Sequence, residues 1–223
     1  MLTIYGVPIS VHTRKVIVSA RHKGIDYASE PVIPFDPPED WRAKSPTGLI
    51  PAITHGDYTL ADSNAICAYL ERVHPGQPLY PDDPSACGRV LWLEQYATTV
   101  LFRDVIHPLF HQKIIRPHIL NQGGPDETEI ARVTGEVVPA VFGYLEDQAE
   151  GDFLVGGAMT VADVSIASNL VNYRYLGFAL HPGRYPKLAA AFRRTIAEPS
   201  FAEALAAEAP FCEQMGLDRS FLS

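Results

Sequence analysis

The sequence predicts an α/β half followed by an all-helical half, and three observations lead to this prediction. Short apolar runs typical of strands alternate with amphipathic helical segments over the first third of the chain. The stretch HPGQPLYPDDP, residues 74–84, is rich in proline and indicates a linker. Beyond it, apolar residues recur at helical spacing over residues 86–120, 126–149, 161–177 and 186–197. We therefore predict domains over residues 1–76 and 87–223, joined by a linker over 77–86.

The elements of the first half follow from local signals. Leu2–Tyr5 has strand character and ends at a Gly-Val-Pro turn, and a helix over Thr13–Lys23 ends at Gly24, a favoured C-terminal residue. The remaining predictions are a strand over Tyr27–Ile33, a proline-rich loop with at most one helical turn over Pro34–Pro46, a hairpin over residues 50–60 and a helix over 63–73. Because the first two strands are joined through a helix, we expect them to pair in parallel. In the second half, the tail AEALAAEA is helix-prone.

Composition excludes several classes of function. The formal net charge of −8 disfavours nucleic acid and anionic membranes as partners, since both would repel the chain. No apolar run approaches the roughly 18 residues needed to cross a bilayer, and MLTIYGVPIS lacks the features of a signal peptide. The cysteines Cys67, Cys87 and Cys212 are widely spaced and indicate neither a metal site nor a disulfide framework. We therefore expect a cytoplasmic protein.

Pro51 stands at the head of the first hairpin strand, in GLIPAITHGDYTL. A proline at the first position of a strand loses no ladder hydrogen bond, which is a sufficient structural explanation. A cis Ile50–Pro51 bond would instead expose the backbone of Ile50 to a ligand. Because only about 5–6% of X-Pro bonds are cis, local sequence alone favours the structural explanation.

Asp62 and Ser63 precede an apolar helical pattern, and both residue types are favoured at the start of a helix. Capping is therefore the first interpretation. A helix N-terminus also presents unpaired N–H groups and a positive dipole end, which suit a carboxylate. Ser63 could hold such a carboxylate while Asp62 holds a nearby ammonium. The pair is thus suited to the head group of an α-amino acid.

Ser10 lies in VPISVHTRKV, between the first strand and the first helix. Ser10 or Thr13 could simply cap that helix. Alternatively, the Ser10 hydroxyl could donate to a thiol at the helix N-terminus and favour its thiolate form. No G-x-S-x-G motif supports a nucleophilic role for this serine.

Two further patterns have structural explanations. Thr160 to Asp163, in TVAD, matches a capping box with Asp in place of Glu and predicts a helix start in the second half. His107 and His111 stand at i and i+4 and could share a metal ion, but an isolated histidine pair is more often solvated or lines a cleft. We therefore predict no metal site.

Taken together, GLIPAI, TLADSNAI, the proline-rich linker and FLVGGAMTVADVSIA occur in an order that resembles the cytosolic glutathione transferase family across nearly the whole chain. The resemblance implies an α/β thioredoxin-like N-terminal domain, an all-α C-terminal domain, glutathione as co-substrate, and a homodimer. It also reverses the expectation for Pro51, because the family's proline at this place is cis. The TVAD stretch matches a family motif that serves folding.

The resemblance carries over to individual residues. Ile50, next to Pro51, would pair its backbone with the cysteinyl part of glutathione, and Asp62 and Ser63 would bind its γ-glutamyl group. SVHTRKV is similar to the family's serine-type turn, which makes Ser10 the residue that stabilises the thiolate. His12 and Thr13 are the other candidates in that turn.

The sequence departs from the family pattern at Leu49. Many relatives carry Lys, Gln or His there, in contact with the glycyl carboxylate of glutathione. A basic group would have to come from elsewhere, and Lys44 and Arg42 are the candidates; otherwise glutathione binding is weak.

The predicted function is transfer of glutathione to a small hydrophobic electrophile, or a related isomerisation or dehalogenation. Val7, Val11 and His12 would form one wall of the electrophile site, and Tyr96, Arg103, His107 and Phe110 the other. A non-catalytic binding or scaffold protein on the same fold is an alternative, favoured by Leu49. A thiol-disulfide oxidoreductase would need a cysteine within Gly6–Arg14, and that segment has none.

Overall fold

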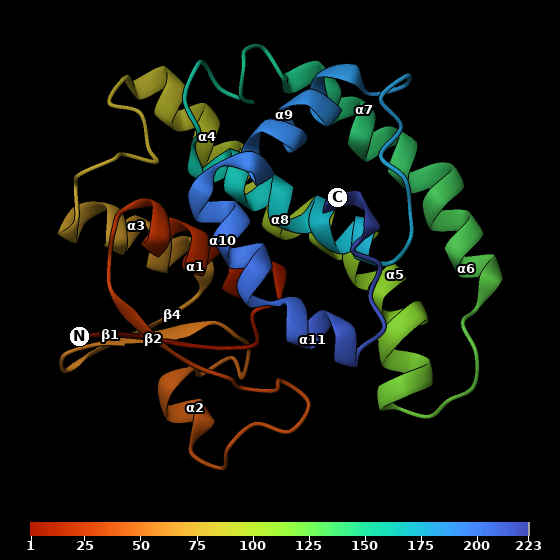
Figure 1. The fold of residues 1–223 in the computed structure, drawn as a ribbon, viewed down its shortest axis with the longest axis horizontal. Coiled ribbons are helices and arrows are strands. Elements are labelled where there is room, and N and C mark those ends of the chain that lie inside the picture. Colours follow the sequence, from red (N-terminus) through yellow and green to blue (C-terminus); the bar gives the residue numbers. More distant parts are fainter. Residues whose placement is uncertain (223) are drawn as a thin grey trace.

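The computed structural model describes residues 1–222, and its first part is a four-stranded sheet with three helices (Figure 1). The elements, in chain order, are β1 (Leu2–Tyr5), α1 (Val11–His22), β2 (Tyr27–Glu30), α2 (Trp41–Lys44), β3 (Ala52–His55), β4 (Tyr58–Ala61) and α3 (Ser63–Val73). The strand order is β2-β1-β3-β4. β1 pairs in parallel with β2, as expected for strands joined through a helix, whereas β3 pairs antiparallel with both β1 and β4.

The two faces of the sheet are covered differently. α1 and α3 lie over one face, where Leu2, Ile4 and Ile53 point into the main hydrophobic core (Figure 1). On the opposite face, Trp41 of α2 packs with Val32 and Ala52 in a smaller cluster. The turn between β3 and β4 contains Gly56 at a φ of +61°, a left-handed conformation that glycine adopts without strain. The sheet therefore carries the starts of α1, β3 and α3 on a scaffold buried on both faces.

Helices make up the second part of the chain. A continuous helical run comprises α4 (Pro84–Tyr96), the π-helical η1 (Ala97–Ile106), α5 (His107–Phe110) and the π-helical η2 (His111–Ile119). The next run comprises α6 (Glu127–Arg132), the π-helical η3 (Val133–Val137) and α7 (Val138–Gln148). The remaining helices are α8 (Val161–Tyr175), α9 (Pro186–Ala197), α10 (Pro199–Ala207), α11 (Ala209–Gln214) and the short 3₁₀ helix η4 (Ser220–Leu222).

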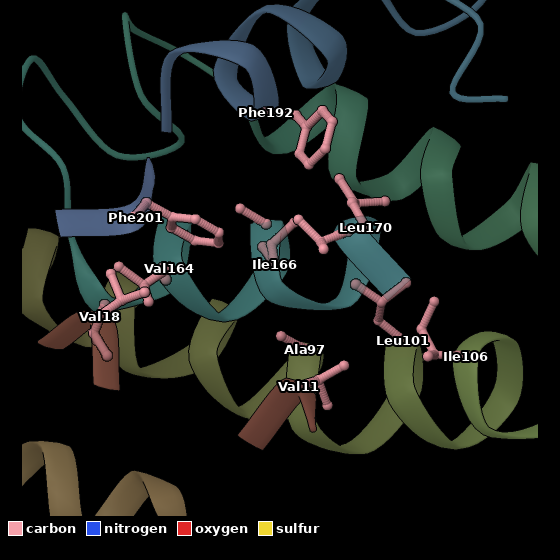
Figure 2. Close-up of a cluster of buried hydrophobic side chains, with 14 of the residues drawn as sticks. Val11, Val18, Ala97, Leu101, Ile106, Val164, Ile166, Leu170, Phe192 and Phe201 are labelled. Atoms are coloured by element: carbon pink, nitrogen blue, oxygen red, sulfur yellow. The ribbon is translucent and has the colours of Figure 1, made fainter. Parts of the chain in front are cut away.

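The helix α8 lies at the centre of this part, with nearly every side chain buried. Val164, Ile166 and Leu170 of α8 are surrounded by side chains from four other elements (Figure 2). These come from α1 (Val11 and Val18), η1 (Ala97 and Leu101), α9 (Phe192) and α10 (Phe201). The helix α8 is therefore buried on all sides, including polar side chains such as Asp163, Asn169 and Asn172. Because α1 also packs against α8, the α/β part and the helical part share one hydrophobic core.

The fold class predicted from the sequence is confirmed, and the differences are local. The expected strand over Tyr27–Ile33 ends at Glu30, because Pro31 cannot donate a ladder hydrogen bond. The helix expected from residue 86 begins at Pro84, where Asp83 accepts a hydrogen bond from the Ala86 amide at 2.8 Å. The domain boundaries at residues 76 and 87 stay a prediction. None of the helices within residues 1–222 is long and apolar enough to cross a membrane.

Candidate functional site

The start of α1 places Ser10 at the end of the loop that follows β1. Ser10 is the N-cap residue, with extended backbone angles (φ −67°, ψ 129°), and is half-buried. Its Oγ accepts from the Thr13 amide at 3.5 Å, at the long limit of a hydrogen bond. The backbone of Ser10 is held more tightly, since the Arg14 amide donates to its carbonyl at 2.8 Å. The hydroxyl proton has no acceptor among the residues that the structure describes, so it can be donated to a ligand.

The start of β3 lies beside this loop. The Ile50–Pro51 peptide bond is cis in the structure. Gly6 has a φ of +147°, and a Cβ added there would lie 2.5 Å from Thr13 Oγ1 and 3.3 Å from Ile50 Cβ. Only glycine fits this close approach of the loop, α1 and β3. Ile50 and the start of α1 are therefore neighbours at one end of the sheet.

The start of α3 carries the Asp-Ser pair. Asp62 is exposed, caps the helix and has a φ of +77°, which Asp tolerates better than most residues. Its Oδ1 accepts from the amides of Asn64 at 2.9 Å and Ala65 at 3.0 Å. Its Oδ2 accepts no hydrogen bond from any described residue. Ser63, the first helical residue, is buried, with 4% of its surface exposed. The capping interpretation is thus correct, and it leaves one carboxylate oxygen for a ligand.

His12 joins the start of α1 to the helical part of the chain. Its half-buried ring makes an edge contact with Phe102 of η1 at a centroid distance of 4.5 Å. The pKa of His12 is lowered to about 4, mainly by burial and also by the charge of Lys15, while the charge of Asp62 opposes the shift. The imidazole is therefore neutral near pH 7.

The basic candidates lie on or beside α2. Lys44 Nζ is 3.8 Å from Asp40 Oδ2 and lies over the Tyr5 ring at 5.5 Å from its centroid. Arg42 donates to the Pro46 carbonyl at 3.0 Å. Leu49, where the family pattern has a polar residue, is exposed. Within residues 1–222, neither cation contacts Ser10 or the Asp62–Ser63 turn, so their role in binding stays a prediction.

The residues expected to form the opposite wall differ in their surroundings. His107 contacts Phe102 at 5.8 Å between ring centroids and so continues the contact that begins at His12. Tyr96 instead packs on Tyr144 at 4.6 Å, and Arg103 pairs with its neighbour Asp104. The ring centroids of His107 and His111 lie 6.3 Å apart. No group of three or more potential metal ligands occurs among the described residues.

Sequence reasoning missed two buried cations, Arg14 and Lys15, which are each 1% exposed. Arg14 pairs with Glu208, and Lys15 pairs with Glu94. The signal in the sequence is two successive basic residues directly before the apolar run Val16–Val18 of α1. Their partners are 194 and 79 residues away, so only the folded chain reveals the pairs.

A cavity of about 650 Å³ lies along α1, and Arg14 and Glu208 are among the residues that line it. It is lined by Ile17 and Arg21 of α1, Tyr27 of β2, and Ala204 and Glu203 of α10, among others. Neither Ser10 nor the Asp62–Ser63 turn lines it. The site is therefore defined by the convergence of three element starts and not by the cavity.

Comparison with known proteins gives consistent results across the chain. Residues 4–78 match the model of the glutathione S-transferase N-terminal domain, and residues 110–208 match that of the C-terminal domain. A glutathione S-transferase from Triticum aestivum is 30% identical over 210 residues, which cover 93% of this chain and 94% of the relative. A probable maleylacetoacetate isomerase from Vibrio cholerae is 28% identical over 214 residues, covering 91% and 94%. The crystal structure of a glutathione S-transferase from Rhodospirillum rubrum superimposes with a TM-score of 0.83 at 27% identity, covering 92% of each chain.

Proposed function

The chain belongs to the cytosolic glutathione S-transferase family and is a glutathione transferase, and on this premise we propose how its residues act. Glutathione binds across the starts of α1, β3 and α3. Ser10 holds its sulfur as the thiolate, which attacks a small hydrophobic electrophile. The observation that carries this proposal is the Ser10 hydroxyl, which caps α1 only loosely, at 3.5 Å, and keeps its proton for a ligand.

Each part of glutathione has a complementary group in the site. Asp62 Oδ2 accepts from the γ-glutamyl ammonium, and Ser63, at the N-terminus of α3, donates to the neighbouring carboxylate. The backbone of Ile50, beside Pro51, pairs with the cysteinyl unit. Lys44 or Arg42 meets the glycyl carboxylate in place of the residue that Leu49 does not provide.

The chemistry is proton loss followed by nucleophilic attack. The thiol releases its proton to solvent, and the Ser10 O–H and the α1 dipole stabilise the resulting thiolate. A thiol pKa lowered by about two units corresponds to about 2.7 kcal/mol of stabilisation. The sulfur then forms a bond to the electrophilic carbon as a leaving group departs with its electron pair. Val7 and His12 form one wall around the electrophile, with Phe102 and His107 opposite, whereas Val11, which the sequence also suggested for this wall, is buried in the main core. We further propose that the enzyme works as a homodimer in the cytoplasm and detoxifies such electrophiles.

A second candidate reaction is a glutathione-dependent isomerisation. The similarity to the relative from Vibrio cholerae, named a probable maleylacetoacetate isomerase, supports this reaction, and the alignment covers 91% of the chain. In that reaction glutathione is regenerated in each turnover, whereas conjugation consumes it. Measuring free thiol during turnover distinguishes the two reactions.

The test is an ultraviolet titration of the bound glutathione thiolate against pH, in the native protein and in Ser10→Ala. We expect a depressed thiol pKa in the native complex and a return toward the free value in Ser10→Ala. Ser85→Ala, which changes an exposed serine in the first turn of α4, is the matched control and should behave as native.

Two results would contradict parts of the proposal. If glutathione does not bind at millimolar concentration, the alternative of a binding or scaffold protein gains support, and Leu49 marks the loss of the site. If glutathione binds but Ser10→Ala leaves the thiol pKa unchanged, another residue stabilises the thiolate. His12 and Thr13 would then be substituted in turn.

A further inference from the structure

We propose that Arg14 and Lys15 are positioning residues, which hold the two ends of the glutathione site against the helical part of the chain. Lys15 holds the Asp62–Ser63 turn, and Arg14 holds the Ser10 turn. Neither side chain needs to touch glutathione. The inference rests on the proposed function, because it assigns a purpose to the residues behind that site.

Lys15 reaches the start of α3 through Asn64. Its Nζ donates to Asn64 Oδ1 and to Glu94 Oε1 of α4, the latter at 2.9 Å. Asn64 is also held from the other side, since its Nδ2 donates to Gln95 Oε1 at 3.1 Å. The backbone amide of Asn64 is in turn one of the two donors to Asp62 Oδ1. A fixed Asn64 therefore fixes the carboxylate that we assign to the γ-glutamyl ammonium.

The pair formed by Lys15 and Glu94 is almost fully buried, with 1% and 2% of the side chains exposed. Burial raises the pKa of Glu94, and Lys15 opposes that shift. Tyr80 adds a hydrogen bond to Glu94 Oε2 at 3.3 Å. A buried ion pair is weak evidence for stability, because two apolar residues in its place are often equally stable. The hydrogen bond from Lys15 to Asn64 indicates a purpose for the ion pair other than stability.

Arg14 reaches the Ser10 turn through the carbonyl of Ile9. That carbonyl accepts from Arg14 Nη2 at 3.3 Å and from Asn172 Nδ2 of α8 at 3.1 Å. Arg14 is itself fixed, since Nη1 donates to Asn172 Oδ1 at 2.9 Å and Nε donates to Glu208 Oε1 at 3.1 Å. The residue before Ser10 is thus held by donors from α1 and α8, which sets where the Ser10 hydroxyl lies.

The two arrangements predict separate effects on glutathione. Loosening the Lys15 arrangement moves the Asp62–Ser63 turn, and so weakens the affinity for glutathione without changing the pKa of its bound thiol. Loosening the Arg14 arrangement moves Ser10, and so raises that pKa with a smaller effect on affinity. A merely structural role would change neither quantity in a variant that stays folded.

The first experiment replaces both members of the Lys15 pair, as Lys15→Met/Glu94→Met. Removing both charges avoids an unpaired buried ion, so the variant is expected to fold with thermal stability close to native. We expect its dissociation constant for glutathione to rise about tenfold, equivalent to about 1.4 kcal/mol, with the thiol pKa unchanged. If the double variant does not fold, the conservative Asn64→Asp, which keeps an acceptor for Lys15, and Asn64→Ala, which removes it, are compared instead. Asn64→Asp should then retain more affinity than Asn64→Ala.

The second experiment removes one of the two donors to Ile9. Asn172→Leu keeps the branching and the number of heavy atoms of the side chain and leaves the ion pair between Arg14 and Glu208 in place. It also removes the Oδ1 acceptor of Arg14 Nη1, which still donates to the Ser168 carbonyl at 2.8 Å. We expect the pKa of bound glutathione to move toward the free value while the dissociation constant changes less than threefold, or about 0.6 kcal/mol. If the leucine variant is unfolded, the smaller Asn172→Ser gives the same readout.

Arg21→Met is the matched control for both experiments. Arg21 also lies on α1 and also pairs with α10, through Glu203 at 2.7 Å, but at the surface and away from the site. It should leave affinity and thiol pKa unchanged. If the native protein binds glutathione and the folded Lys15 and Asn172 variants match it in both quantities, the inference is wrong. If the native protein does not bind glutathione, the proposed function fails instead.

Discussion

The starts of α3 and α8 use an aspartate in different ways. Asp62 is exposed at the start of α3 and uses one carboxylate oxygen, Oδ1, for the cap. Asp163, in the first turn of α8, is 1% exposed and uses both oxygens. Its Oδ1 accepts from the Leu154 amide at 2.8 Å, and its Oδ2 accepts from the amide and hydroxyl of Thr160 at 2.8 and 2.7 Å.

The difference separates a structural aspartate from one available to a ligand. A ligand needs an acceptor that the protein has not already used, and it needs access to that acceptor. Asp163 offers neither, because it is buried and both its oxygens accept hydrogen bonds from Leu154 and Thr160, in the loop before α8. Asp62 offers both. The same residue type at a helix start is therefore structural in α8 and, by our proposal, functional in α3.

The largest effect is expected from Asp163→Ala. The substitution leaves the buried amides of Leu154 and Thr160 without acceptors, at about 1–3 kcal/mol each, so we expect the free energy of unfolding to fall by about 4 kcal/mol. Urea unfolding followed by circular dichroism measures the loss. Glutathione affinity, per folded molecule, should stay native. A variant that keeps native stability but loses glutathione binding would reverse the roles assigned to the two aspartates.

A smaller effect is expected from His12 at the start of α1. Because burial lowers its pKa from 6.5 to about 4, the unfolded chain binds a proton between these values and the folded chain does not. His12 therefore contributes stability that is present above pH 6.5 and is lost as pH falls toward 4. Going from about pH 7.5 to about pH 5 should cost about 2 kcal/mol through this group.

His12→Gln removes that titration. Urea unfolding at the two pH values should show a smaller acid loss in the variant than in the native protein, by about 2 kcal/mol. An equal loss in both proteins would mean that His12 titrates normally in the folded chain. The measurement is made without glutathione, so it reports the effect of His12 on the stability of the free protein alone.

The sequence predicted those parts of the fold and site that depend on neighbouring residues. The caps at Ser10 and Asp62 were predicted because each capping side chain bonds to an amide two or three residues away. Pro31 ended β2 earlier than its apolar pattern suggested. The cis form of the bond before Pro51 could not be derived from local sequence, which favours trans, and was expected only from the family resemblance.

Longer-range features could not be predicted in this way. Glu208 follows α10 and Glu94 lies in α4, so Arg14 and Lys15 meet these partners only in the folded chain. The π-helical stretches η1, η2 and η3 likewise lie inside segments whose apolar spacing indicates only a helix. Pattern therefore predicts which elements form and where they start, whereas the partners of a buried charge are set by tertiary packing.

The smallest effect on stability is expected from Asp62→Asn, and it tests the comparison most directly. Asparagine caps helices as well as aspartate does and tolerates a positive φ, so the free energy of unfolding should change by only a few tenths of a kcal/mol. The side chain loses its charge, however, and with it the attraction for the γ-glutamyl ammonium. We expect the dissociation constant for glutathione to rise about tenfold, measured by isothermal titration calorimetry.

Asp126→Asn at the start of α6 is the matched control for Asp62→Asn. Asp126 is also an exposed cap, and its Oδ1 accepts from the amides of Thr128 at 3.0 Å and Glu129 at 3.3 Å. Its capping hydrogen bonds therefore match those of Asp62, although its φ is −81° and not positive, and it lies outside the proposed site. Both variants should keep native stability, and only Asp62→Asn should lose affinity. If both bind glutathione as the native protein does, the unused oxygen of Asp62 is solvated and the ammonium is held elsewhere.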